Sequence, residues 1–584
     1  MRLKSVRVIK IIFTLSLIDM CAYANAQIPI QQSVEIQKWQ EDHIKAQRQQ
    51  QIEQQQNRQR TTNSASEFMP NVTKVDQADD VACQMISQVV ITNGRTSPNN
   101  QVSRLTYQLQ THANQYLATH KNCLSIANII ELQNQLASIL IELGYLTTHI
   151  VVPNQNLKEG TLHLELQIGT LSAIQVQGQT IGNPKWLMLG WQDNIYNQRD
   201  ADQALENLKR LPSQASAQIE LTASEKPNGS NLTYKFPQLI FKDRINGVIS
   251  IDNSGTYGSG RYQANASLSI DSPLGFYDSL TINAGSNINF EQVNRYNNRN
   301  YGVYWDVPIG YNSLQLSTTQ STYLRTHAGY GRNVKMKGET TESAMTLERV
   351  LYRNSNYIQT LSLKFADTRN HVYFDGHDLD VERRNYLYTH WNWGHRYYRD
   401  SAQYSVYMGY KSNLLKYTDN GEHQWHNKFN LWNLALSAYV PFQIGRAQWH
   451  YSGTLKAQYA ESDLPASEMF SIGNRYSVRG TDETYSLMSE NGATLRNEWA
   501  YHWRHNTQST TQIYSTLDWG VVHGQAVPYA NAGLTGRSLV GSSLGVRGQY
   551  HTVGYDLAVG YTLHKPKELI QRGPSITGSL SWQF

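Results

Sequence analysis

Cysteine, charge and long apolar runs are all scarce in this chain. Three of its 584 residues are cysteines and 17% are charged, and the mean hydropathy is −0.54. After residue 26 no apolar stretch approaches the ~20 residues that a membrane-spanning helix needs. These absences argue against a helical inner-membrane protein. The formal net charge of +5 gives no indication of a nucleic-acid partner.

The first 26 residues predict export from the cytoplasm. Four basic residues precede an apolar run, and Ala24 and Ala26 frame a small-residue cleavage site. We expect a signal peptide over 1–26 and a mature chain that begins at Gln27. A lipoprotein anchored at Cys21 is the weaker alternative, because no small residues precede that cysteine. Loss of the leader's four basic residues and one acidic residue lowers the formal charge from +5 to +2.

Cleavage of the leader leaves two cysteines in an oxidising compartment. Cys83 and Cys123 are then an isolated pair, and such a pair in an exported protein predicts one disulfide. Two free buried thiols are the alternative.

The mature chain begins with a helix-prone segment of unusual polarity. Nine of the 21 residues over 40–60 are glutamine, so a helix there has no apolar stripe to bury against a core. The segment 27–60 is therefore either disordered or coiled-coil-like, or a helix in a polar, water-lined cavity. A linker rich in Thr, Asn, Ser and Asp follows over 61–80.

Two small α+β modules are predicted next, over 81–168 and 169–236. The first alternates in the order strand, helix, helix, strand, strand, and its second helix carries isoleucine and leucine at helical spacing from Ile126 to Leu143. The second module repeats the order in shorter form, with a helix over 199–210 followed by a strand from Ala215 to Ala223. Two tandem modules are the simplest interpretation of this repeat.

From 237 to 584 the pattern predicts a transmembrane antiparallel β-barrel. Strands of roughly ten residues alternate apolar and polar side chains, and the chain contains 37 tyrosines and 13 tryptophans, which suit aromatic girdles. The final apolar residues share one strand face and end at Phe584, which resembles the terminal signal of outer-membrane barrels. Spacing predicts about 16 strands. A soluble array of β-sandwiches is the alternative.

Four sequence segments carry a resemblance to a known family. They are LGYLTTHIVVPNQNLKEGTLHLELQIG in the first module, NQRDADQALENLKRLPS in the second, IDNSGTYGSGRYQ at the start of the barrel and GNRYSVRGTDE late in it. In this order and spacing they resemble the two-partner secretion transporters, the TpsB family. The resemblance covers nearly the whole mature chain and implies two POTRA domains, an N-terminal plug helix in the barrel lumen and a loop folded into that lumen.

Arg479 lies in the segment that resembles the lumen loop, between Val478 and Gly480, and falls in the sixth extracellular loop. A loop tip held inside a barrel needs a multi-donor cation with a fixed carboxylate partner. Strand parity turns Asp518 toward the lumen, so we expect a salt bridge between Arg479 and Asp518. The family's aromatic positions are Thr481 and Thr516 here, which puts their stacking role in doubt.

The resemblance implies a protein of the Gram-negative outer membrane with its POTRA domains in the periplasm. Its partners would be one large secreted exoprotein and outer-membrane lipid, and we expect a monomer. A contact-dependent growth inhibition (CdiB-type) transporter is the favoured subgroup, with a haemolysin or adhesin exporter close behind. A factor that assembles barrels in the outer membrane is the rival function, and a plain diffusion porin leaves the two modules unexplained.

No catalytic or cofactor-binding signature is found, so we expect neither an enzyme nor a cofactor. No nucleophile elbow is present. His390 and His395 differ by five residues and would point to opposite faces of a strand, which makes a shared metal site improbable.

Overall fold

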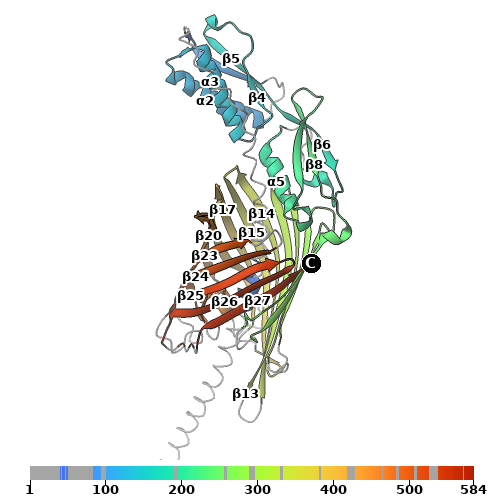
Figure 1. The fold of residues 1–584 in the computed structure, drawn as a ribbon, viewed down its shortest axis with the longest axis vertical. Coiled ribbons are helices and arrows are strands. Elements are labelled where there is room, and N and C mark those ends of the chain that lie inside the picture. The colour runs from blue at the N-terminus through green and yellow to red at the C-terminus, as the bar shows by residue number, and fades with distance from the viewer. Residues whose placement is uncertain are drawn as a thin grey trace, which may run out of the picture.

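Two small α+β modules lie beyond one end of a large β-barrel in the computed structural model (Figure 1). The structure describes residues 38, 40, 42–46, 48–49, 83–93, 100–187, 195–255, 260–288, 296–328, 333–379, 383–416, 428–462, 464–481, 486–504, 509–524, 537–567, 569, 571 and 573–584. The predicted leader over 1–26, the linker over 61–80 and most of the segment over 27–60 lie outside these residues. None of the described helices is long and apolar enough to cross a membrane.

The first module is a three-stranded sheet packed against two helices. Ser125 begins the second helix with a capping box, because its hydroxyl accepts from the backbone N–H of Asn128 at 3.2 Å. Buried leucines at helical spacing then face the sheet in one apolar core. The strands of the sheet lie in the order β2-β5-β4. Along the chain the elements are β1 (Gln84–Met85), β2 (Gln88–Asn93), α2 (Asn100–Thr119), β3 (Cys123–Leu124), α3 (Ile126–Glu142), β4 (His149–Val151) and β5 (Thr161–Gln167).

A disulfide joins Cys83 to Cys123 in the first module, with a sequence separation of 40. The same two residues lie beside the short β1–β3 pairing, where Met85 is opposite Cys123. The bridge therefore ties the start of the module to the turn between its two helices.

Replacing both Cys83 and Cys123 with serine should destabilise the first module by about 4 kcal/mol, because a bridge over a loop of this length restricts the unfolded chain. Hydrogen exchange of α2 and α3 in the full-length, detergent-solubilised protein measures the effect, and α5 of the second module is the internal control. Unchanged exchange in α2 and α3 would contradict the expectation.

The second module has the sheet order β6-β8-β7 with its long helix against the sheet. Buried Leu208 and Tyr234 lie in its core, which also takes in Tyr277 from a barrel turn. A strand was predicted to start at Ala215, but a short 3-10 helix occupies 212–214 and the strand starts at Gln218. The elements are β6 (Thr170–Gln177), α4 (Pro184–Leu187), α5 (Gln198–Lys209), β7 (Gln218–Ala223) and β8 (Gly229–Lys235).

Sixteen long antiparallel strands close the barrel within the described residues, as predicted. The first and last of them pair, with Ile251 opposite Leu580. The strands are β9 (Ile245–Asp252), β10 (Gln263–Asp271), β11 (Ser279–Asn287), β12 (Tyr296–Ile309), β13 (Asn312–Ala328), β14 (Asn333–Arg353), β15 (Tyr357–Phe374), β17 (Arg384–Arg399), β18 (Ala402–Lys416), β19 (Asn430–Ile444), β20 (Ala447–Ala460), β23 (Asn491–Arg504), β24 (Ser509–His523), β25 (Ser538–Tyr550), β26 (Val553–His564) and β27 (Ser575–Gln583). A two-residue strand, β16 (His377–Asp378), extends the tip of β15.

Side-chain alternation along the strands divides the barrel wall into an apolar outer face and a polar inner face. On β24, Leu517 and Trp519 are exposed on the outside, whereas Thr516 and Asp518 are buried on the inside. The apolar end of the last strand is also exposed, including Leu580 and Trp582. This is the expected arrangement for a wall between lipid and a water-filled lumen.

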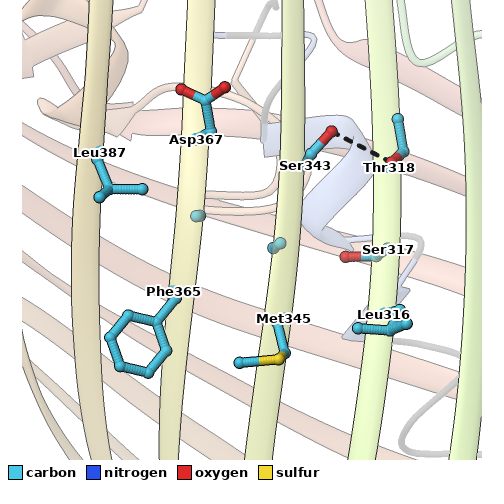
Figure 2. Close-up of a pocket in the computed structure, with 10 residues that line it drawn as sticks. Leu316, Ser317, Thr318, Ser343, Met345, Phe365, Asp367 and Leu387 are labelled. Atoms are coloured by element: carbon cyan, nitrogen blue, oxygen red, sulfur yellow. Dashed lines mark hydrogen bonds between the residues drawn. The ribbon is translucent and has the colours of Figure 1, made fainter. Parts of the chain in front are cut away.

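Strands β13 to β15 are much longer than the predicted ten residues. On their outer face Leu316, Met345 and Phe365 form an apolar row, and Thr318, Ser343 and Asp367 form a polar row beside it (Figure 2). The two rows border a shallow hollow of about 380 Å³. Beyond Ser343 the outward residues of β14 are polar as far as the strand's end, and among the described residues the paired ends of β13 and β14 lie farthest from the two modules (Figure 1).

Candidate functional site

The sixth long loop, between β20 and β23, folds back into the barrel lumen. It carries a 3-10 turn, η7 (Ala466–Glu468), and a small hairpin of β21 (Phe470–Ile472) and β22 (Leu487–Ser489). Its side chains Ile472, Val478 and Leu487 share one buried apolar cluster with Val522 and Leu539 of the wall. This cluster holds the loop, hereafter the lumen loop, against the inner face of β24 and β25.

The structure brings Arg479 and Asp518 together at the tip of the lumen loop. Arg479 donates from Nε to Asp518 Oδ2 at 2.7 Å and from Nη2 to Oδ1 at 2.9 Å, so the contact is bidentate. The backbone N–H of Arg479 also donates to Oδ2 at 3.0 Å. Asp518 is fully buried and receives a further backbone N–H from Asn497 at 3.1 Å. The carboxylate therefore fixes both the side chain and the backbone of the loop tip.

Glu498 on β23 is a second acidic partner of Arg479, and the sequence reasoning missed it. Arg479 Nη1 lies 2.6 Å from Glu498 Oε2, and Arg547 on β25 pairs with the other carboxylate oxygen. Burial alone would lower the pKa of Arg479, but Asp518 and Glu498 outweigh it and raise the pKa, so the guanidinium stays charged. The parity that turned Asp518 inward, applied to β23, would also have found Glu498.

The two neighbours of Arg479 shape the tip for this contact. Val478 is fully buried. Gly480 has a φ of +89°, and a Cβ placed there would lie 2.5 Å from the carbonyl oxygen of Ser542. Only glycine allows the loop backbone to approach β25 this closely in a left-handed conformation.

The two threonines at the family's aromatic positions make hydrogen bonds. Thr481 donates from its hydroxyl to the carbonyl of Val478 at 2.8 Å, which closes the turn around Arg479. The Thr516 and Ser543 hydroxyls lie 2.7 Å apart between β24 and β25. Thr481 therefore stabilises the loop tip itself, whereas Thr516 links the two wall strands β24 and β25.

A helical segment from the N-terminal part of the chain lies inside the barrel. Its described residues 38, 40, 42–46, 48 and 49, hereafter the lumen segment, contact both the wall and the lumen loop. Gln40 donates to the carbonyl of Thr322 at 3.0 Å, and Arg48 lies 3.3 Å from Asp306. His43 meets the hydroxyl of Tyr476 in the loop at 2.7 Å. The lumen segment therefore contacts strands β12 and β13 of the wall as well as the lumen loop.

A buried ionic contact fastens the second module to the barrel. Glu206 on α5 pairs with Arg353 at the end of β14 and lies 3.7 Å from Arg396 on β17. Burial alone would raise the pKa of Glu206, but the two guanidinium groups outweigh it and lower the pKa. Nearby, burial raises the pKa of Asp200 to about 6, although the Tyr311 hydroxyl donates to it at 2.5 Å. These contacts place α5 on the short turns of the barrel.

The two histidines considered as metal ligands lie apart. His390 contacts Asn433 at 3.3 Å on the inner face, whereas the ring of His395 is 5.9 Å from that of Trp393. Within the described ranges, no three His, Cys, Asp or Glu side chains gather in a metal-binding arrangement.

Comparison with known families matches two parts of the chain. Residues 241–548 match the family described as haemolysin secretion/activation protein ShlB/FhaC/HecB. Residues 87–169 match the POTRA domain of the ShlB type. The first match covers most of the barrel, from before β9 to near the end of β25, and the second covers most of the first module.

Individual relatives show the same likeness. The chain is 28% identical over 463 residues to the outer membrane transporter CdiB-2 of Burkholderia pseudomallei, covering 77% of this chain and 76% of that protein. It is 24% identical over 386 residues to the haemolysin transporter ShlB of Serratia marcescens, covering 65% and 67%. The solved structure of CdiB from Acinetobacter baumannii superposes with a TM-score of 0.80 at 23% identity, covering 95% of this chain and 99% of that one.

Proposed function

Because the chain belongs to the ShlB/FhaC/HecB family of haemolysin secretion/activation proteins, we propose that it exports one large partner exoprotein across the outer membrane by two-partner secretion. It lies in the outer membrane of a Gram-negative bacterium, with its POTRA domains in the periplasm. The observation that carries the proposal is a closed barrel whose lumen holds a loop fixed by Arg479 and Asp518. Such a lumen suits a gated pore for an unfolded chain.

We propose that the POTRA domains capture the unfolded exoprotein by strand addition. In the second POTRA domain β7 is an edge strand of six residues, paired on one side with β8. An extended peptide could add to its other side through main-chain hydrogen bonds. Because α5 of the same domain is fastened to the barrel by Glu206, a captured segment would be held close to the pore.

We propose that the lumen segment is part of a plug helix over 27–60 that leaves when cargo enters. Its polar contacts with the wall and the loop suit an aqueous lumen and can be exchanged for water at little net cost. Folding of the exoprotein outside the cell would drive export, since the sequence carries no nucleotide-binding motif.

The CdiB relatives favour one class of cargo. We propose a contact-dependent inhibition toxin, a very large filament, as the exported partner, with the transporter acting as a monomer in outer-membrane lipid. A haemolysin or adhesin remains the alternative cargo.

Export of a candidate partner exoprotein tests the proposal. In cells that express both proteins we expect the exoprotein on the cell surface or in the medium. Cells that express the exoprotein alone should retain it in the periplasm, where an unfolded chain is degraded. Equal surface exposure with and without the transporter would refute the proposal.

A further inference from the structure

The lumen loop has a second charged attachment, well separated from Arg479 in sequence. Glu468, the last residue of η7, lies with Oε1 2.6 Å from Nζ of Lys411 on β18. The hydroxyl of Tyr386 on β17 donates to the same carboxylate oxygen at 2.7 Å. Lys411 Nζ also lies 3.7 Å from the centre of the Tyr388 ring. Lys411 and Tyr386 thus hold a single loop carboxylate, and the ring of Tyr388 contacts the lysine.

The Glu468–Lys411 pair is shielded from water. The side chains are 10% and 11% exposed. Leu464 and Met469 of the loop pack beside them in an apolar cluster with Phe429, Leu431 and other wall residues. A buried charge that loses its partner is strongly destabilising, so this part of the loop depends on both members of the pair.

The same part of the loop is where the lumen segment makes contact. Lys38 donates to the carbonyl of Ser467 at 3.3 Å, directly beside Glu468. Ser471 donates from its hydroxyl to Asp42 Oδ2 at 2.6 Å. Burial alone would raise the pKa of Glu468, but the ammonium groups of Lys411 and of Lys45 in the lumen segment outweigh it and lower the pKa. The loop limb 466–472 therefore lies between the wall and the lumen segment.

We propose that Glu468 and Lys411 are positioning residues that fix the limb 466–472 as the seat of the plug. Arg479 then fixes the tip of the lumen loop, and Glu468 fixes the surface on which the plug rests. Loss of the pair would loosen the limb and release the plug, while the tip stays attached through Asp518. The inference rests on the proposed function only in treating the lumen segment as a plug.

Single-channel recording of the full-length protein in planar bilayers tests this assignment. Lys411→Gln and Glu468→Gln should each raise the fraction of time in a large-conductance state roughly tenfold, because each leaves a buried charge unpaired. The matched control is Lys364→Gln. It also removes a lumen lysine, but that lysine's partner at 2.6 Å, Glu342, lies on the neighbouring wall strand. This control should behave as wild type, and the exchanged pair Lys411→Glu with Glu468→Lys should restore closure at least in part.

A cross-link separates loss of the seat from general damage to the barrel. Cysteines at Asp42 and Ser471, oxidised in the Lys411→Gln background, should return the channel to its closed state. Unchanged conductance in both single variants, an equal rise in Lys364→Gln, or no closure on cross-linking would each overturn the assignment. None of these readouts requires cargo, so a failure of export would count against the proposed function and leave this inference standing.

Discussion

Replacing Arg479 with alanine should abolish most export of the exoprotein while the barrel still inserts. The variant leaves fully buried Asp518 without its bidentate partner and Glu498 without one of its two arginines. Removing one member of a buried pair costs about 3–5 kcal/mol, and water in the lumen reduces this figure. Even a residual cost of about 1.4 kcal/mol shifts the fraction of correctly seated loops tenfold. Exoprotein in the medium, measured by immunoblot, reports the effect.

Two further variants sharpen the Arg479 experiment. Arg479→Lys keeps the charge, but one ammonium cannot replace the planar fork that reaches two carboxylates, so we expect an intermediate loss. Arg369→Ala is the matched control, because that arginine also pairs with an aspartate, Asp367, at 3.0 Å, yet is 64% exposed. Its export should equal that of wild type. Heat-modifiable migration in gel electrophoresis confirms that the barrel of each variant is folded and inserted. Normal export by the alanine variant of Arg479 would disprove the anchoring role.

Deleting residues 27–60 should raise the channel conductance at least severalfold. A helix with its side chains is about 10–12 Å across, and the lumen segment contacts the wall at Thr322 and Asp306 and the loop at Tyr476. Its removal therefore frees a continuous part of the lumen cross-section. Planar-bilayer recordings measure the change.

The control for the deletion keeps the segment and alters only its sequence. Replacing exposed Gln49 with alanine changes one side chain of the segment and leaves its charges in place, and we expect a much smaller change in conductance. Wild-type conductance in the deleted protein would mean that the lumen segment does not occlude the pore.

The sequence predicted the barrel and the inward position of Asp518 because a strand's period of two is a local property. Alternation alone predicted that Asp518 points into the lumen and that its neighbour Trp519 points outward. In the structure Asp518 is buried on the inner face and Trp519 is exposed on the outer face. The strands of the two three-stranded module sheets and the long helices were likewise predicted from local periodicity, with boundary differences of a few residues such as the start of β7 at Gln218. The short pairing of β1 with β3 was not predicted.

The charged contacts across the lumen were beyond this reasoning. Glu468 and Lys411 are 57 residues apart, and their meeting depends on how far a loop folds back into the barrel. The periodicity of a strand or helix carries no information about how deeply the loop enters the lumen. The same holds for Glu206 and Arg353, which meet because α5 packs on the short barrel turns. Such pairs are determined by tertiary packing between elements that each look ordinary in sequence.

The extension of β14 makes one side of the barrel taller at the mouth of the pore. From Ser343 to Asn333 the strand continues for ten residues with a polar outer face, which at ~3.3 Å per residue and the usual strand tilt amounts to roughly 25 Å. Among the described barrel strands β14 is the longest, so an emerging polypeptide would meet its polar extension on one side of the pore.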